Sequence, residues 1–337
     1  MRTPGFLGRV PVPLRQTFQA DIERLANHYE ADTGKTLRYE TCSGAEWFAP
    51  FKQLNQRTAP QNLPDMLCIT GSADILSSPN LTHYRNDHAL LAASAMHPAF
   101  AQSGLPDPQH IFHLFAAIPF VLLIDHEKLD GRPAPRRWAD LLNPLYQSDI
   151  VFGGWKPDPG KPYTEFNRFL LLAIYRFFGS KGLHAFAQNV KDIQHHVVIA
   201  RTAGTRSPQA SAISILPWMQ ASMCPHRAHT EIIWPDDGAL TMPLACLIQP
   251  KAITSLRPLI DYFYSAQWQQ FLMQACYPPV MPTWCTALPN DASFKWLGWD
   301  FVRENPMLQL SQTAATLFFN AWIPANRIPV KEYRQCS

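Results

Sequence analysis

Two long apolar runs stand out from the mixed pattern of hydrophobic and polar positions along the chain. They span residues 115–124 and 239–248, and each contains one proline, Pro119 or Pro243. Because proline cannot donate to a strand ladder, it is confined to edges, bulges and places where a strand leaves its sheet. The pattern therefore predicts two crossover strands that carry the chain between two lobes.

The crossovers divide the chain into predicted lobes. Residues 1–115 and 248–337 form lobe 1, residues 125–238 form lobe 2, and residues 116–124 and 239–247 form the hinge crossovers. The length of 337 residues exceeds the usual limit of about 250–300 residues for one core, which also favours two domains. We expect a ligand cleft between the lobes.

Helical and strand-like patterns alternate along both predicted lobes. Residues 17–33 and 163–178 place apolar residues at helical spacing, and each segment is followed by a glycine, as is typical of a helix end. Residues 311–322 predict a terminal helix, whereas residues 63–69 and 231–234 predict short strands. Alternation of this kind is typical of parallel sheets, so the predicted fold class is α/β.

Composition and charge narrow the class of protein. Hydrophobic residues make up 47% of the chain and charged residues 16%, which is typical of a globular protein. The net charge is +3 and the chain has no long basic run, so nucleic acid is not an expected partner. No apolar run reaches the ~18 residues of a transmembrane helix. We therefore expect no membrane insertion.

The N-terminus and the cysteines bear on the compartment. The first residues contain no apolar stretch typical of a signal peptide. The seven cysteines are odd in number and form no CxxC pair, which favours reduced, buried thiols over a disulfide framework. Both features predict a cytoplasmic protein, and the alternative is a periplasmic protein from which a leader has been removed.

Several segments together resemble the type II periplasmic binding protein-like superfamily, and within it the substrate-binding proteins of iron-type ABC transporters. The matching segments, in order, are residues 63–65 (LPD), 118–124 (IPFVLLI), 136–144 (RRWADLLNP), 234–239 (WPDDGA) and 295–300 (KWLGWD). The resemblance implies a two-lobe α/β fold with two hinge crossover strands. It also implies a non-enzymatic role as the solute-binding component of an ABC-type transport system.

Two features depart from the family that the chain resembles. Arg137 stands where the family helix begins with Ser or Thr, so the usual N-cap is missing. Ferric-binding members use an adjacent pair of tyrosines, and none of the ten tyrosines here is adjacent to another. Ferric iron is therefore not inherited from the resemblance, and the expected solute is small and anionic or metal-linked.

The solute is expected at loops that follow the predicted strands, where helix N-termini favour anions. An ordinary cap or turn is the alternative for each small or hydroxyl residue, and a turn is favoured for Asp236 and Asp237 before Gly238. The guanidinium of Arg206 matches a carboxylate or phosphate bidentately. The expected ligand-binding residues are Ser43, Gly44, Gly71, Ser72, Gly153, Gly154, Trp155, Thr205, Arg206, Ser207, Trp234, Asp236 and Asp237.

No recognisable catalytic or metal-binding motif accompanies these loops. The chain contains no GxSxG, P-loop, HExxH or GxGxxG sequence. The spacing of Cys224, His226 and His229 matches no structural zinc pattern, and the pair His195 and His196 is interpreted as part of an exposed polar loop. We therefore expect no catalytic residue, no metal site and no cofactor.

Three classes of function stay open at this point. The favoured one is a monomeric solute-binding protein whose partners are a small-molecule or ion ligand and an ABC permease. The second is a cytoplasmic enzyme on the same fold, in which Cys42, Cys224 or a histidine acts on the bound molecule. The third is a ligand sensor that acts through a protein partner.

Overall fold

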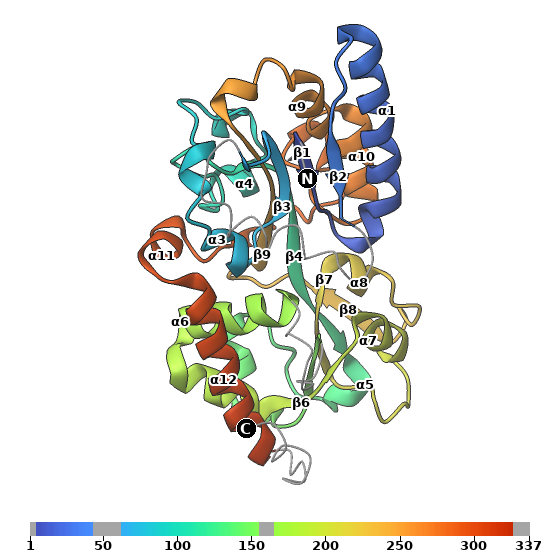
Figure 1. Ribbon diagram of the computed structural model, residues 1–337. Coiled ribbons are helices and arrows are strands. Elements are labelled where there is room, and N and C mark those ends of the chain that lie inside the picture. The colour runs from blue at the N-terminus through green and yellow to red at the C-terminus, as the bar shows by residue number, and fades with distance from the viewer. Residues whose placement is uncertain (1–4, 43–61, 155–164, 326–337) are drawn as a thin grey trace, which may run out of the picture. The chain divides into compact units, whose positions relative to one another are not determined.

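The computed structural model describes residues 5–42, 62–154 and 165–325 (Figure 1). The chain forms two compact units, and the first two boundaries between them fall inside the two proline-containing runs. Unit 1 consists of the chain up to Ile118, Thr241–Leu288 and Gly298–Arg303, and unit 2 consists of Pro119–Leu240, Pro289–Leu297 and the chain from Glu304 onward. None of the described helices is long and apolar enough to cross a membrane.

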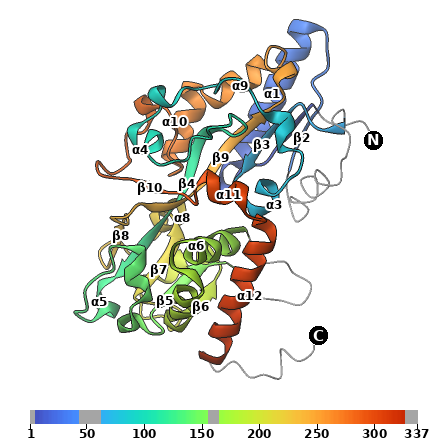
Figure 2. The same ribbon diagram turned by 90° about the vertical axis from the view of Figure 1, so that its left-hand side faces the viewer.

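The last part of the chain differs from the expected division. All of residues 248–337 were expected in lobe 1, whereas residues 289–297 and the chain from Glu304 belong to unit 2. The physical reason is packing within unit 2, where α12 (Met307–Ala325) lies along α6 (Glu165–Asn189) (Figure 2). The predicted terminal helix is confirmed, but its apolar stripe does not specify which helix it packs against.

The sheet of unit 1 is centred on β1 (Phe6–Gly8). This strand is parallel to β2 (Tyr39–Thr41) on one side and to β3 (Met66–Thr70) on the other. β3 also pairs, in antiparallel orientation, with β9 (Ala239–Ile248). Helix α1 (Arg15–Thr33) confirms the helix predicted over residues 17–33 and ends at Gly34, which adopts a left-handed conformation.

The other elements of unit 1 are short. They are η1 (Val12–Leu14), α3 (Ala73–Leu76), η3 (Leu81–Tyr84), η4 (Ala93–Ala95), α4 (Pro98–Ala101), η7 (Pro250–Ala252), α9 (Arg257–Phe263), α10 (Ala266–Gln274), η8 (Pro282–Trp284) and most of α11 (Trp299–Glu304).

The sheet of unit 2 is centred on β5 (Ile150–Gly153), which is parallel to both β6 (Val190–Gln194) and β7 (Ile213–Pro217). β7 pairs, in antiparallel orientation, with β4 (His113–Asp125), and β8 (Thr230–Ile233) also pairs with β4. The smaller elements are α5 (His126–Leu129), η5 (Trp138–Leu142), η6 (Pro144–Tyr146), α7 (His196–Thr202), α8 (Trp218–Ser222) and β10 (Phe294–Lys295).

Pro243 lies where β9 loses its partner β3. The last pair of the two strands is Thr70 with Leu244, and the next residues along are Gly71 and Pro243. The Gly71 N–H donates to the Pro243 carbonyl at 2.9 Å. A hydrogen-bonded antiparallel pair normally exchanges two bonds, and proline supplies only the carbonyl half. The proline therefore removes one bond at the end of the ladder and none inside it.

Pro119 occupies a similar position on β4. The pairing of β4 with β7 ends at Phe120 and Pro217. Before Pro119 in the chain, the Ala117 N–H donates to the carbonyl of Pro278 at 3.0 Å. The position of the missing N–H of Pro119 therefore lies between the partner segment at Pro278 and the partner strand β7. Both prolines mark points at which a long strand changes partners, which is the physical reason that the sheet tolerates them.

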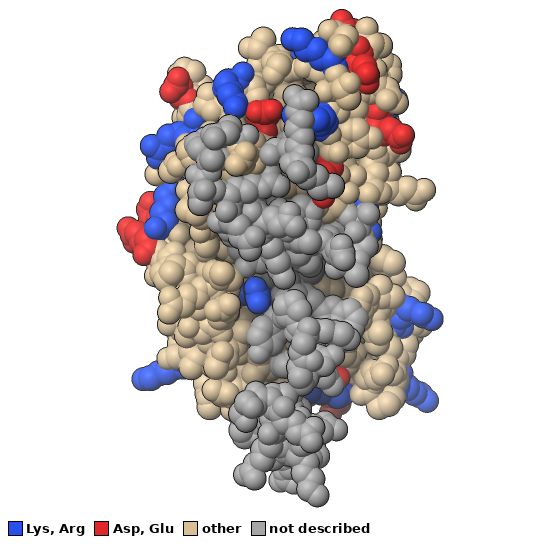
Figure 3. All heavy atoms as spheres, in the orientation of Figure 1, with Lys and Arg blue, Asp and Glu red and all other residues tan. Residues whose placement is uncertain are grey.

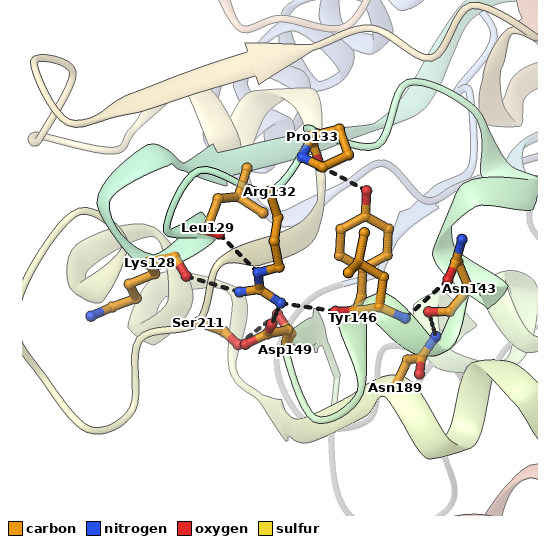
Figure 4. Close-up of polar contacts among 10 residues, drawn as sticks. Lys128, Leu129, Arg132, Pro133, Asn143, Tyr146, Asp149, Asn189 and Ser211 are labelled. Carbon is orange, nitrogen blue, oxygen red and sulfur yellow. Dashed lines mark hydrogen bonds and ion pairs between the residues drawn. The ribbon is translucent and has the colours of Figure 1, made fainter.

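A polar network in unit 2 holds the segment that precedes β5 (Figure 4). Arg132 donates to three backbone carbonyls and forms an ion pair with Asp149. The Tyr146 hydroxyl and the Asn189 side-chain amide donate to further carbonyls of the same segment. Because β5 begins immediately after Asp149, this network lies at the amino end of the strand, and its role is structural.

The helix of the WADLLNP segment, η5, begins without a Ser or Thr cap. The Asp140 carboxylate instead accepts the backbone N–H groups of Arg136 and Arg137, both at 2.9 Å. The indole N–H of Trp138 donates to the Gly238 carbonyl at 2.8 Å. Asp140 therefore supplies the reciprocal half of a capping box, and the backbone N–H of Trp138, the first residue of the helix, donates to the Asp237 carboxylate at 3.2 Å.

Candidate functional site

The candidate site is built from the carboxyl ends of parallel strands, since ligands of α/β proteins bind outside these ends. Unit 1 has three such ends, those of β1, β2 and β3. Among the described residues of unit 2, such ends belong to β5, β6 and β7, and the two-residue strand β10 is also parallel to β9.

Arg9 follows β1 directly and is 1% exposed. Its Nη2 atom donates to the Thr70 hydroxyl at 2.9 Å and lies 3.5 Å from the Ser72 hydroxyl. Thr70 is the last residue of β3 and Ser72 precedes α3. We call Arg9, Thr70 and Ser72 the unit 1 cluster. It places one guanidinium and two hydroxyl groups at adjoining strand ends.

Gly71 is required by close packing at the same edge. A Cβ atom at this position would lie 2.5 Å from the Cγ atom of Pro243. Its N–H is already bonded to the Pro243 carbonyl. Gly71 therefore holds β9 against the end of β3, while Ser72 remains a candidate ligand residue. Ser43 and Gly44 lie outside the residues that the structure describes.

Cys42 follows β2 and is buried, with its backbone N–H donating to the Gly8 carbonyl at 3.0 Å. Burial raises the pKa of the Cys42 thiol to about 12. A thiol with such a pKa carries almost no thiolate at neutral pH, and the thiolate is the nucleophile. Cys42 is therefore unsuited to the catalytic role considered for it.

Gly153 and Gly154 end β5 and are both approached by side chains from neighbouring helices. A Cβ atom on Gly153 would overlap the imidazole of His196, the first residue of α7. A Cβ atom on Gly154 would overlap the side-chain amide of Asn167, in the first turn of α6. We call Gly153, Gly154, Asn167 and His196 the unit 2 cluster. Trp155 lies outside the described residues.

The polar groups of the unit 2 cluster are uncharged at neutral pH. His196 is half-buried as a residue, but its Nε2 atom is fully enclosed. Burial, with a smaller contribution from His195, lowers the pKa of His196 to about 4. The side chain of Asn167 is completely buried. His196 thus corrects the interpretation of this histidine as part of an exposed loop, and Asn167 was not predicted at all.

An aromatic group lies at the end of β7. Trp218 begins α8 immediately after this strand and meets Trp234 edge to face, with ring centroids 5.5 Å apart. Phe294 lies 5.8 Å from Trp234, whose indole N–H donates to the Ser293 carbonyl at 2.8 Å. The predicted residue Trp234 therefore belongs to a packed aromatic group, in which Trp218 follows β7 and Trp234 follows β8.

Asp236 and Asp237 shape the turn before β9, as the sequence favoured. The carboxylate of Asp236 lies 3.3 Å from the Arg136 guanidinium. The carboxylate of Asp237 accepts the backbone N–H of Trp138 at 3.2 Å and lies 3.2 Å from the Lys295 ammonium. Both acidic groups therefore bind side chains and backbone of unit 2 itself.

Thr205, Arg206 and Ser207 lie in the loop that leads into β7. The Thr205 hydroxyl donates to the Thr202 carbonyl at 2.6 Å and accepts the Ser207 N–H at 3.2 Å. Because this loop precedes the strand, it lies at the amino end of β7, opposite to the end of β5 that carries Gly153. The topology does not bring these three residues together with the unit 2 cluster.

Charges and metal ligands are sparse in the described part of the chain. On the face drawn in Figure 3, the described Lys, Arg, Asp and Glu side chains are scattered and do not gather into a patch of one sign. Among residues 5–42, 62–154 and 165–325, no group of three His, Cys, Asp or Glu side chains is placed to hold a metal ion. The guanidinium of Arg9 is thus the charged group of the two clusters.

Comparison with known structures identifies the fold. The Trichodesmium FutA (IdiA) structure in complex with iron and citrate has a TM-score of 0.61 at 11% identity, over 94% of this chain and 98% of that chain. Spermidine/putrescine-binding PotD from Streptococcus pneumoniae has a TM-score of 0.57 at 11% identity, over 96% and 99%. AfuA from Actinobacillus pleuropneumoniae, with bound fructose-6-phosphate, has a TM-score of 0.55 at 13% identity, over 97% and 100%.

These similarities define the fold as the two-lobe α/β fold of type II periplasmic binding proteins, which confirms the predicted fold class. No curated protein sequence is recognisably similar to the chain. Residues 61–305, well over half of the chain, match the family described as bacterial extracellular solute-binding protein, and the chain belongs to this family.

Proposed function

We propose that the protein is the solute-binding component of an ABC-type transport system and that it captures a small anionic or metal-linked solute between its two lobes. Family membership supports the solute-binding role. Structures of the same fold carry solutes as different as iron with citrate and fructose-6-phosphate. The fold therefore does not specify the solute, and the side chains of the two clusters indicate the chemistry of the solute.

One observation carries the proposal: in each unit, polar side chains gather where parallel strands end. The unit 1 cluster supplies the Arg9 guanidinium and two hydroxyl groups. The unit 2 cluster supplies the Asn167 amide and the neutral His196 imidazole. A guanidinium pairs bidentately with carboxylates and phosphates, and neutral donors and acceptors fix orientation without adding charge. This combination favours a carboxylate or phosphate group, free or as part of a metal chelate.

The proposed mechanism is a population shift between open and closed states. A solute held by both clusters favours the closed state because it gains contacts with the second unit only there. The proposed hinge lies in residues 116–124 and 239–247, where Pro119 and Pro243 stand at the ends of strand pairings. A backbone with fewer ladder bonds is easier to bend, and hinges are formed by a few such residues.

The family supports a proposal for the partner and for the compartment. We propose that an ABC permease receives the solute and that the protein works outside the cytoplasm, as the description of the family as extracellular favours. The enzyme alternative is weakened because the two cysteines considered as its nucleophiles are buried. Cys42 has a raised pKa, and Cys224 is 3% exposed with its sulfur enclosed by Ala203 and Thr230.

A ligand panel tests the proposed function. Citrate, phosphate, fructose-6-phosphate, ferric citrate and spermidine are added singly while the melting temperature and small-angle scattering are recorded. We expect at least one anionic compound to raise the melting temperature and to reduce the radius of gyration. If no compound changes either quantity, solute capture of this class is contradicted. Turnover of a stabilising compound would instead favour the enzyme.

A further inference from the structure

Two cysteines of unit 1 face each other across neighbouring strands. Cys68 on β3 is the direct partner of Cys246 on β9 in the antiparallel ladder. The Gly71 N–H donates to the Pro243 carbonyl, so Gly71 and Pro243, which continue the same register, are a hydrogen-bonded pair. This pair fixes which later pairs of the ladder are hydrogen-bonded. Because hydrogen-bonded and non-hydrogen-bonded pairs alternate, the two cysteines form a non-hydrogen-bonded pair.

Such a pair has the spacing that a disulfide needs. The Cα atoms of a non-hydrogen-bonded antiparallel pair lie about 4.5 Å apart, inside the range of about 4.4–6.8 Å found for disulfides. The Cys68 thiol also contributes to the raised pKa of the Cys246 thiol, as expected of neighbouring sulfur atoms. The backbone spacing of the pair therefore allows the two sulfur atoms to be joined without movement of the strands.

The third cysteine of this region is too distant to compete. Cys42 lies just past the end of β2, and β1 separates β2 from β3. Adjacent strands are about 4.8 Å apart, so backbones two strands apart are separated by about 9–10 Å. Two cysteines whose Cα atoms are more than about 7 Å apart cannot be bridged without backbone movement. The geometry therefore selects Cys246 as the partner of Cys68.

We propose that Cys68 and Cys246 are a redox site, which forms a cross-strand disulfide when the chain folds in the presence of a disulfide donor such as glutathione disulfide or a thiol oxidoreductase. In the structure both cysteines are free and buried, as the sequence predicted, and the proposal concerns a chain that folds in the presence of such a donor. It is independent of the nature of the solute.

The reaction balances with the donor as the oxidant. The Cys68 thiolate attacks one sulfur of the donor, and a mixed disulfide forms while one donor thiol leaves. The Cys246 thiolate then attacks the Cys68 sulfur and releases the second donor thiol. The two protein thiols lose two electrons to the donor disulfide, and their protons end on the two released thiols.

The reaction belongs to the folding stage because the folded protein hides both sulfur atoms. Cys68 is 0% and Cys246 1% exposed. Burial raises the pKa of the Cys246 thiol, and the neighbouring Cys68 thiol adds to this shift. Buried thiols with raised pKa values are inert toward disulfide exchange. A donor therefore reaches them only before β3 and β9 have paired.

Refolding under defined redox conditions tests the site. The full chain is unfolded in guanidinium chloride with reductant, refolded with a mixture of glutathione and glutathione disulfide, alkylated and digested for mass spectrometry. We expect a linked peptide that joins Cys68 to Cys246. We also expect a melting temperature about 5–10 °C above that of the reduced protein, because the bridge closes a long loop. The same mixture added to protein that was never unfolded is expected to give no such peptide.

Two serine variants provide the control. Cys246→Ser is expected to lose both the linked peptide and the oxidant-dependent rise in melting temperature, whereas Cys224→Ser keeps both. If Cys246→Ser does not fold, the peptide map of the wild-type protein alone tests whether Cys68 is linked to Cys246. Free Cys68 and Cys246 in refolded protein of native circular dichroism, or linkage of Cys68 to another cysteine, overturns the proposal. Linkage in the never-unfolded protein overturns its assignment to the folding stage.

Discussion

The two clusters of strand-end residues differ in charge although they occupy equivalent positions on their sheets. The unit 1 cluster contains the buried guanidinium of Arg9, held by the hydroxyl of Thr70. The unit 2 cluster contains the Asn167 amide and a His196 imidazole that burial keeps neutral. In the proposed function this difference corresponds to separate tasks: the guanidinium of unit 1 attracts an anion, and the uncharged groups of unit 2 recognise its shape.

Acid has the largest expected effect, because it introduces charge where the fold excludes it. The pKa of His196, and that of His113 in the core of unit 1, are both lowered to about 4 by burial. The unfolded chain, with an ordinary histidine pKa near 6.5, therefore binds more protons between pH 6.5 and 4. Stability present above pH 6.5 is lost as the pH falls toward 4, by up to about 3 kcal/mol for each histidine.

Urea unfolding between pH 7 and pH 4 measures this loss, and the histidine variants separate the units. His196→Gln and His113→Gln are each expected to flatten the pH dependence. His196→Gln is also expected to change solute affinity at pH 7, whereas His113→Gln, which lies outside both clusters, leaves affinity unchanged. An undiminished pH dependence in both variants contradicts the assignment of this loss to buried histidines.

Alanine at the end of β5 has the next largest expected effect. Gly153→Ala and Gly154→Ala place a Cβ atom against His196 or Asn167, and such overpacking costs about 1–3 kcal/mol. Gly5→Ala is the matched control in unit 1, where a Cβ would meet only ordinary contacts of 3.4 Å or longer. The free energy of unfolding from urea titration compares the three. Equal stabilities would show that the unit 2 cluster is not tightly packed.

Arg9→Lys tests the role of the charged group in the unit 1 cluster. Lysine keeps the positive charge but loses the planar fork that pairs bidentately with carboxylates and phosphates. We expect affinity for an anionic solute to fall about 10-fold, equivalent to about 1.4 kcal/mol, with the fold preserved by circular dichroism. Unchanged affinity in isothermal titration would remove Arg9 from the site.

Arg206→Ala has the smallest expected effect and separates the sequence-based site from the structural one. The sequence predicted that this substitution weakens anion binding. Since the loop of Arg206 precedes β7, we expect the affinity to change by less than about 2-fold, or about 0.4 kcal/mol. A loss of affinity comparable to that of Arg9→Lys would show that the loop at the amino end of β7 belongs to the binding site.

The sequence predicted the elements of the fold better than the residues of the site. Pro119 and Pro243 could be interpreted locally, because the missing N–H of proline restricts where a strand can hold it. The sequence also named Gly153 and Gly154 as expected ligand-binding residues because they follow an apolar run, and the structure places them at the end of β5. The order of strands, in contrast, depends on packing between segments far apart in the chain.

The missed and misplaced site residues have the same origin. Asn167 and His196 meet the two glycines only after α6 and α7 have packed on β5, and neither residue carries a local signal of this contact. The arginines and hydroxyls of the Arg206 loop favour anion binding by composition alone. Its position before β7, however, places it at the amino end of that strand.

Hydrogen exchange with bound solute tests most directly the claim that the solute binds at the strand ends of both units. The compound of the panel that raises the melting temperature most is added at saturation. We predict slower exchange of backbone amides in residues 9–10 and 70–73 of unit 1 and in residues 153–154 and 195–198 of unit 2, with no change in residues 203–210. Protection confined to one unit, or centred on residues 203–210, contradicts the account.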